Sequence, residues 1–516
     1  MRYLFKNASI ITILSGAGVA CGLALDALIL AVFGVGTQTD AYFAALALPL
    51  LIVNTLAIQG PKVLIPVITQ SLGQQGREAT WDLLRNLITT AAAALMGIAA
   101  LGMLLAGLLM PAQIPGLEDP VVSLAAELNR WLFLLVPLQG SAVILQSVLY
   151  AHHRYLASSA GKLITNCLAL VFAALFYQRL GIQAVALGMI AGASAQLALM
   201  YLALLNRGFR YRFAFHPGDP LLRNALSSLK YPLAGNAVAE TRALLENLLG
   251  SFLGGGSLTV LRYASRIVTA IAGVLMGSII QATFPLVAHH AAAGDEGKMR
   301  KAILQSVKLL ALAGVPISLW LAFTAQPLLV LLFERAEFTR SDAALTGVLV
   351  VLMTPYILLS RLIGVAQTPF YSLLEMHPPF YSTLVFFAVN TASALLLIKH
   401  WGLYSLPLAL SLASLCGALF MIAQLNRRFG PVGWPSLRGF LWRLLAAGLV
   451  SAFGLVSGTY LTQLITAQGL IEKLLDLAVP SMLGLGAFAA MALMLRLVDL
   501  RSLRPGADRA LLSRDA

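Results

Sequence analysis

The chain is built from apolar runs that are each long enough to cross a lipid bilayer as a helix. A bilayer core of about 30 Å requires roughly 20 consecutive apolar residues in a helical span. Only 11% of the 516 residues are charged, whereas a soluble domain averages about 25%. The sequence therefore predicts an all-α integral membrane protein with about fourteen transmembrane helices. The expected spans cover residues 8–33, 41–69, 83–110, 130–150, 160–177, 182–205, 226–252, 264–288, 303–332, 344–368, 380–398, 403–425, 440–465 and 474–498.

Lysine and arginine are distributed unequally between the two sets of connections. The connections on the side of the amino terminus hold 23 of these cations, and those on the other side hold seven. Because cytoplasmic loops carry an excess of Lys and Arg, we expect both termini in the cytoplasm. The same bias accounts for the net charge of +14. The expected partner is therefore the lipid bilayer, and nucleic acid is not expected.

No connection is long enough to fold as a separate catalytic domain. The longest one, residues 206–225, is basic and carries four aromatic residues between its arginines. It either lies along the anionic inner leaflet or is an ordinary cytoplasmic linker. The sequence contains no HExxH, GxSxG or Walker motif and no cysteine spacing typical of a zinc site. These features favour a transporter over an enzyme, with no cofactor or metal and with H⁺ or Na⁺ as the candidate coupling ion.

Proline-containing segments recur at a nearly constant separation. Pro66 and Pro285 are 219 residues apart (285 − 66), and Pro137 and Pro355 are 218 apart (355 − 137). Such a duplication predicts two parallel six-span lobes, related by a pseudo-two-fold axis along the membrane normal, around a central site. We expect an N-lobe over residues 1–205, a cytoplasmic linker over 206–225, a C-lobe over 226–425, and two further spans with a basic tail over 426–516.

Nine ionisable residues lie at membrane depth, where charge is costly and normally faces protein or a water-filled cavity. Spans one, two, seven and eight are equivalent pairs under the repeat, and they carry seven of the nine. We therefore expect these spans to line a central cleft. The nine residues are Asp26, Asp40, Lys62, Glu240, Arg242, Glu246, Arg266, Lys308 and Arg361.

Some of these residues also have a purely structural interpretation, which the sequence leaves open. Asp40 is suited to capping a helix N-terminus, and Lys308 to extending its ammonium toward the interface. Arg242 and Glu246, spaced i,i+4, are suited to neutralising each other. Lys62 follows Gly60-Pro61, where we expect the helix to break beside a cavity.

The cations of the predicted cleft suit an anionic cargo. Arginine grips phosphate oxygens with two donors, and lysine adds a point charge. We expect the substrate-binding residues to be Arg266, Arg361, Lys62, Arg242 and Asp26. The acids Glu246, Glu240 and Asp40 either hold the arginines in position or bind the coupling ion, and the sequence does not separate these roles.

Three segments resemble motifs of one transporter family. Gly34–Phe43 (GVGTQTDAYF) resembles the GxGxxTDAFF opening of the MurJ/MviN proteins, which flip lipid-linked peptidoglycan precursor. Gly256–Arg266 (GSLTVLRYASR) is similar to that family's GSVSxLxYAxR segment, and Phe370–Pro379 (FYSLLEMHPP) to its FYALxDTRTP segment. The resemblance implies the fold of the multidrug/oligosaccharidyl-lipid/polysaccharide (MOP) exporter superfamily.

The sequence departs from the family pattern at positions that bear on which substrate is transported. Leu25 stands where the family has an arginine before the aspartate that matches Asp26, and of the family's cleft arginines only Arg266 clearly matches. Family arginines also correspond to Val19, Val53 and Asn54. The resemblance therefore implies a flippase that moves an undecaprenyl-diphosphate-linked saccharide by alternating access, with an exopolysaccharide repeat unit favoured over a lipid II-like precursor.

Two other functions stay open at this point. One is a cation-coupled multidrug antiporter of the same superfamily, and the other, less favoured, is a membrane polysaccharide polymerase or ligase. For the flippase we expect a monomer that works beside proteins of polysaccharide or cell-wall biosynthesis.

Overall fold

The computed structural model describes residues 2–74, 76–152, 155–206, 208–216, 218–292, 294–335, 337–373, 375–433, 437–464 and 468–497. Inside the helices it describes the side chains outside residues 2–13, 15, 62, 70, 74, 155, 220–232, 274–286, 288–289 and 291–292. The expected cleft position of the Lys62 side chain and the expected basic tail after residue 497 therefore lie outside the described residues.

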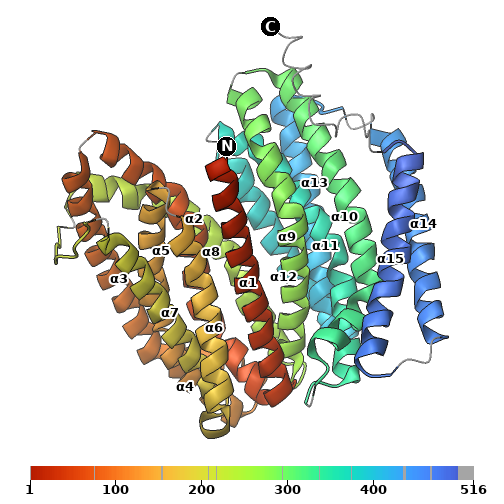
Figure 1. Ribbon diagram of the computed structural model, residues 1–516, viewed down its shortest axis with the longest axis horizontal. Coiled ribbons are helices and arrows are strands. Elements are labelled where there is room, and N and C mark those ends of the chain that lie inside the picture. Colours follow the sequence, from red (N-terminus) through yellow and green to blue (C-terminus); the bar gives the residue numbers. More distant parts are fainter. Residues whose placement is uncertain are drawn as a thin grey trace. The chain divides into compact units, whose positions relative to one another are not determined.

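The helices account for nearly all regular structure in the described ranges, which contain no strand (Figure 1). The α-helices are α1 (Arg2–Phe33), α2 (Thr37–Gln74), α3 (Gly76–Gln113), α4 (Asp119–Leu132), α5 (Leu135–Ala151), α6 (Tyr155–Leu180), α7 (Gln183–Leu205), α8 (Pro220–Ser251), α9 (Ser257–Ala292), α10 (Glu296–Phe333), α11 (Arg340–Ser372), α12 (His377–Trp401), α13 (Ser405–Phe429), α14 (Arg438–Gln463) and α15 (Leu470–Met494). One 3₁₀ turn, η1 (Gly402–Tyr404), separates α12 from α13.

The prediction of an all-α membrane protein is confirmed. Each expected span falls on its own helix in chain order, and α4 is an additional short helix that leads into α5. Within the described residues, 11 stretches are long and apolar enough to cross a membrane, two of which contain a helix pair, α4–α5 and α12–α13. α8 and α9 are not among these stretches. Residues 240–246 of α8 alone include three charged side chains.

One expectation about α2 is wrong. The helix continues from Thr37 to Gln74 with Pro49, Pro61 and Pro66 inside it, so it does not break after Gly60. Neighbouring helices and local backbone adjustments can compensate for the hydrogen bond that a proline removes, which is why membrane helices tolerate this residue. The cavity that we expected a helix break to open beside Lys62 therefore loses its basis.

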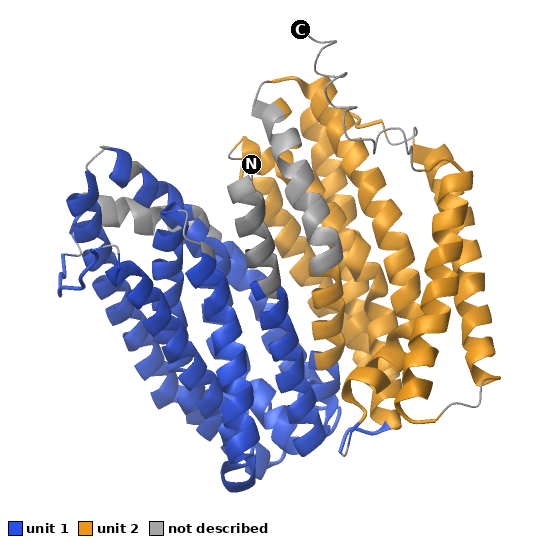
Figure 2. Ribbon diagram, viewed as in Figure 1, with its two compact units in different colours: residues 1–262, 335–339 blue, residues 263–334, 340–516 orange. Residues whose placement is uncertain are grey.

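The chain divides into two compact units (Figure 2). Unit 1 comprises residues 1–262 and 335–339, and unit 2 comprises residues 263–334 and 340–516. Their boundary lies inside α9 because α8 packs against α2 and α3 of unit 1. The lobes expected from the repeat, 1–205 and 226–425, divide the chain elsewhere and stay a prediction about duplication.

Part of the connection between α7 and α8 folds back onto unit 1. Phe209 is completely buried in a core cluster with Trp81, and their ring centroids are 5.3 Å apart. Nε of Arg85 on α3 donates a hydrogen bond to the carbonyl oxygen of Arg210 at 3.0 Å. Phe213, by contrast, is 79% exposed. The first part of this connection is therefore fastened to the helices, and an apolar side chain further along it stays uncovered.

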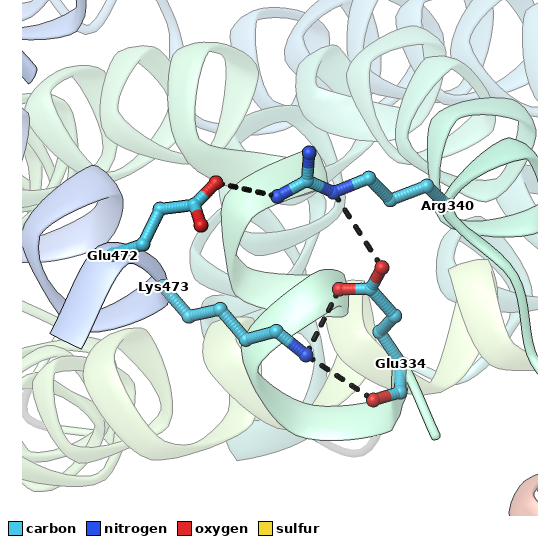
Figure 3. Close-up of polar contacts among 4 residues, drawn as sticks. All are labelled: Glu334, Arg340, Glu472 and Lys473. Atoms are coloured by element: carbon cyan, nitrogen blue, oxygen red, sulfur yellow. Dashed lines mark hydrogen bonds and ion pairs between the residues drawn. The ribbon is translucent and has the colours of Figure 1, made fainter. Parts of the chain in front are cut away.

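A four-residue ion network joins three helix ends of unit 2 (Figure 3). Nη2 of Arg340, at the start of α11, lies 2.8 Å from Oε1 of Glu472 at the start of α15. Nζ of Lys473 lies 2.9 Å from Oε2 of Glu334, which follows α10, and Nε of Arg340 lies 3.5 Å from Oε1 of the same glutamate. Two acids and two bases thus neutralise each other and tie α15 to α10 and α11.

Glycines allow α14 and α15 to approach each other closely. A Cβ atom at Gly458 would lie 2.5 Å from Cα of Pro480, which is closer than van der Waals contact permits. Small residues at helix interfaces are the usual means of close packing in a bilayer, where lipid removes the hydrophobic driving force.

This packing leads to a stability prediction. Gly458→Ala should lower the free energy of unfolding by about 1–3 kcal/mol, because the added methyl group meets proline backbone that cannot rotate away. Thermal unfolding of the detergent-solubilised protein measures the effect. Gly486→Ala is the matched control, since a Cβ there meets nothing within 4 Å. Equal melting temperatures for the two variants would contradict the close approach.

Candidate functional site

The segment Gly34–Phe43, the first of the three motif-like segments of the sequence, contains a self-contained helix start. Gly36 precedes α2, and Thr39 lies in its first turn. Thr39 Oγ1 accepts a hydrogen bond from the Gly36 N–H at 3.1 Å and donates one to the Gly36 carbonyl at 2.9 Å. A side-chain oxygen thereby satisfies an N–H group that has no partner inside the helix. The backbone of residues 34–40 is fixed locally, which positions the next side chain, Asp40.

Asp40 connects this motif to the start of α9. Its Oδ2 accepts from the N–H of Gly256 at 2.6 Å, and its Oδ1 accepts from the N–H of Thr259 at 2.8 Å and from Thr259 Oγ1 at 2.6 Å. The residue is 0% exposed. Gly256 has a φ of +86°, and a Cβ there would lie 2.7 Å from Cγ1 of Val35. We call Asp40, Gly256 and Thr259 the Asp40 clasp.

The clasp gives Asp40 a structural role within unit 1. A carboxylate at a helix N-terminus satisfies unpaired N–H groups and interacts favourably with the helix dipole. Here the carboxylate comes from α2, and the helix that it caps is α9, whose first residues belong to the same unit. Because the side chain is completely buried, it does not face a hydrated cleft.

A row of polar side chains joins α2 to α8 about midway along the two helices. Nδ2 of Asn54 donates to Oε2 of Glu240 at 3.3 Å. Nε2 of Gln59 donates to Oδ1 of Asn236 at 3.4 Å, and Nδ2 of Asn236 donates to Oγ1 of Thr55 at 3.3 Å. We call these five residues the α2–α8 polar row. Of the five, sequence reasoning identified only Glu240 as a site residue, although amides inside apolar spans, with Asn236 one turn before Glu240, were a usable signal.

Arg242 and Glu246 lie further along α8. Nη1 of Arg242 is 2.6 Å from Oε1 of Glu246, and the two side chains are 20% and 16% exposed. Such a pair is close to neutral as a unit. The polar row and the pair together provide amide, hydroxyl and carboxylate groups that can hydrogen-bond a hydroxyl-rich ligand.

The remaining candidates belong to both units. Asp26, on α1 of unit 1, is 3% exposed. Arg266 on α9 is exposed, and Arg361 on α11 is half-buried, both in unit 2. Nε of Arg361 is buried and has no hydrogen-bond partner within the described part of the chain. The meeting of these three residues in one cleft stays a prediction.

Metal chemistry has no visible basis among the side chains that the structure describes. Within those residues, no group of three or more His, Cys, Asp or Glu side chains could hold a metal ion. Cys21 on α1 and Cys167 on α6 lie close together, with 2.7 Å between their sulfur atoms, and both are free thiols.

The chain is similar to known proteins in sequence and in fold. The model of one protein family, described as "Lipid II flippase MurJ", matches residues 29–479. Among curated relatives, the "Probable lipid II flippase MurJ" of Borreliella burgdorferi is 24% identical over 304 residues. That match covers 59% of this chain and 60% of the relative.

Solved structures share the fold. A structure titled "Lipid II flippase MurJ, inward closed conformation" matches with a TM-score of 0.78 and 16% identity, over 94% of this chain and 98% of that one. An inward-facing MATE family transporter of the MOP superfamily matches with a TM-score of 0.67 and 14% identity, over 82% of this chain and 99% of that one. At these identities the likeness concerns the fold, which is that of the MOP transporters. Because the family model spans most of the sequence, the chain belongs to the lipid II flippase MurJ family and is a multi-pass membrane transporter rather than an enzyme.

Proposed function

We propose that the protein is a flippase that moves a polyprenyl-diphosphate-linked saccharide from the inner to the outer leaflet by alternating access. The observation that carries this proposal is the match of the flippase family model to residues 29–479. A diphosphate and a sugar head cannot cross the apolar core of a bilayer unaided, because desolvation of charged and polar groups is costly. A protein that encloses the head in a polar environment, while the lipid tail stays in the bilayer, removes that cost.

The proposed binding residues fall into three groups, which bind the diphosphate, the sugar and the coupling ion. Arg266 and Arg361, with Lys62, supply cations for the diphosphate, since guanidinium groups bind phosphate oxygens with two donors. The α2–α8 polar row supplies donors and acceptors for sugar hydroxyl groups. Asp26 and Glu240 are the acids proposed to bind H⁺ or Na⁺ during the cycle, whereas Arg242 and Glu246 balance each other and Asp40 holds the start of α9.

Two cargoes fit this chemistry. The relatives that match carry the name lipid II flippase, which favours the lipid-linked peptidoglycan precursor. Leu25 and Val53 stand where the family pattern has arginines, which instead favours a related saccharide such as an exopolysaccharide repeat unit. We propose lipid II as the first cargo to test, because the whole family model, rather than two positions, supports it.

The proposed setting is the bacterial inner membrane, with both termini in the cytoplasm. The support is the excess of cations in one set of connections, 23 against seven. In this orientation the basic connections face the anionic cytoplasmic leaflet.

Arg266 provides the test of the proposed function. Arg266→Glu should abolish growth rescue of a strain depleted of its own lipid II flippase, because a carboxylate repels the diphosphate. The measurement is colony formation at equal membrane protein levels. Arg179→Glu, a charge reversal at the exposed last turn of α6, is the matched control and should rescue like the unmodified chain.

The outcomes of the rescue experiment are distinct. Full rescue by Arg266→Glu would remove that residue from the site. Failure of the unmodified chain to rescue, combined with restored polymer export in a strain lacking its exopolysaccharide flippase, would replace lipid II by the second cargo.

Substitutions at Asp40 and at Glu240 should have different effects, the first on stability and the second on transport. Asp40→Asn places an amide NH₂ or an ill-suited acceptor against the Gly256 and Thr259 donors, and should lower the free energy of unfolding by about 1–3 kcal/mol. Glu240→Gln keeps an acceptor for Asn54 and should leave the melting temperature nearly unchanged while reducing transport.

Thermal unfolding and the rescue assay, run on the same preparations and strains, check both variants. Asp82→Asn is the matched control for Asp40, because Asp82 is 73% exposed in its pair with Arg85 and contributes little. A stable Asp40→Asn protein would contradict the clasp, and a fully active Glu240→Gln protein would contradict the role of that acid.

A further inference from the structure

Unit 2 contains a pocket outside the predicted cleft, where α10, α14 and α15 meet. Its volume is about 410 Å³. Lys308 of α10, Arg443 of α14 and Arg496 after α15 line it together with Phe440, Leu312 and Leu497. Beneath the lining, α10, α14 and α15 share a small core cluster that includes Ala311, Leu444 and Phe488. The pocket therefore has a packed apolar floor and a cationic wall.

Among the residues that the structure describes, no acidic side chain neutralises the three cations of the pocket. No acidic side chain is among the residues that line the pocket, and none of the three cations has an ion pair among the side chains described. Elsewhere in unit 2, Arg300 pairs with Glu296, and Arg428 pairs with Glu375. Nζ of Lys308 lies 5.9 Å from the ring centroid of Phe440, which leaves its donors available. Three cations around one cavity form a site for an anion.

Arg496 reaches the pocket through an unusual backbone conformation. The helix α15 ends at Met494, and the Leu497 N–H bonds the Ala492 carbonyl at 2.9 Å, a helix-ending pattern that places the intervening residue in the left-handed region. That position is normally glycine, but here it is Arg496, with a φ of 53°. It is the one non-glycine residue with positive φ in the described part of the chain. A non-glycine residue in this conformation strains the backbone, and such strain is typical of residues with a functional role.

The rim of the pocket is suited to lipid chains. Leu309 beside Lys308 is 49% exposed, and Leu441 and Leu445 on α14 are 49% and 53% exposed. The pocket lies toward the amino-terminal end of α10, at the start of α14 and at the end of α15, which the cation bias assigns to the cytoplasmic side. Basic pockets between membrane helices on that side are suited to the phosphate groups of anionic lipids.

We propose that this pocket binds the phosphate headgroup of an anionic phospholipid of the inner leaflet, such as phosphatidylglycerol. Lys308, Arg443 and Arg496 contact the phosphate oxygens, and the acyl chains lie along the exposed leucines of α10 and α14. None of the proposed cargo-binding residues lines this pocket, so its occupation does not depend on the proposed flippase function. A bound lipid would fasten α14 and α15 to α10 by filling the space between them.

The test is a lipid-binding measurement on the purified full chain in detergent. Phosphatidylglycerol should raise the melting temperature in a saturable manner, and phosphatidylcholine should not. Each cation removed should weaken binding about five-fold. For Lys308→Gln with Arg443→Gln, the phosphatidylglycerol concentration that gives half the maximal shift should therefore rise about 25-fold.

The matched control removes two cations from the same two helices. Lys301→Gln with Arg438→Gln has the same change in charge, and both residues are exposed and outside the pocket lining. It should change the half-maximal concentration less than about two-fold. Equal weakening in both double variants, an equal response of the unmodified chain to phosphatidylcholine, or an equal shift with inorganic phosphate alone would overturn the lipid assignment.

The variant Arg496→Gly tests backbone strain and lipid binding separately, because it removes the strained side chain and the cation together but affects two different measurements. Glycine accepts the left-handed conformation without the penalty that a side chain carries there. The variant should therefore melt at the same temperature as the unmodified chain, or higher, when no lipid is added. Its half-maximal phosphatidylglycerol concentration should rise about five-fold. An unchanged lipid response would remove Arg496 from the site.

Discussion

A polar group that enters a bilayer must find its partner within the protein, because lipid offers none. This constraint explains why the described chain is built from helices and why its internal polar groups occur in contact with one another. The Asp40 clasp, the α2–α8 polar row and the Arg242–Glu246 pair are three solutions to the same requirement. Each satisfies donors and acceptors that would otherwise be stranded between apolar side chains.

The clasp is the most demanding of the three, since it joins residues that are more than two hundred positions apart. One carboxylate accepts three hydrogen bonds from Gly256 and Thr259, and glycine is needed at residue 256 because the backbone there has positive φ next to Val35. Both partners lie in segments that resemble family motifs. The resemblance of those two segments therefore has a physical origin in one structural contact, and Asp40 is explained without a role in binding cargo.

Cations in this protein fall into two groups with different consequences. Arg242, Arg340 and Arg428 face acids, and such pairs fix the geometry of neighbouring helices. Lys308, Arg443 and Arg496 line a cavity that has no acid among its described lining residues, and this arrangement is the basis of the proposed anion site. The proposed lipid pocket and the proposed cargo site thus rest on the same electrostatic principle, the attraction of cations for phosphate.

The sequence by itself determined the fold class, the order of the helices and the family, because span length and apolar composition depend only on local residues and the motifs are contiguous. It also predicted membrane depth for the charged residues of α8 and for Asp26, Arg266 and Arg361. Only the tertiary structure decided which polar groups meet. Asn54 with Glu240, Asp40 with Thr259, and Lys308 with Phe440 are pairs set by helix packing between distant segments, and no local spacing encodes them. The continuity of α2 through Pro61 was decided in the same way, since neighbouring helices supply the packing that a lone helix would lack.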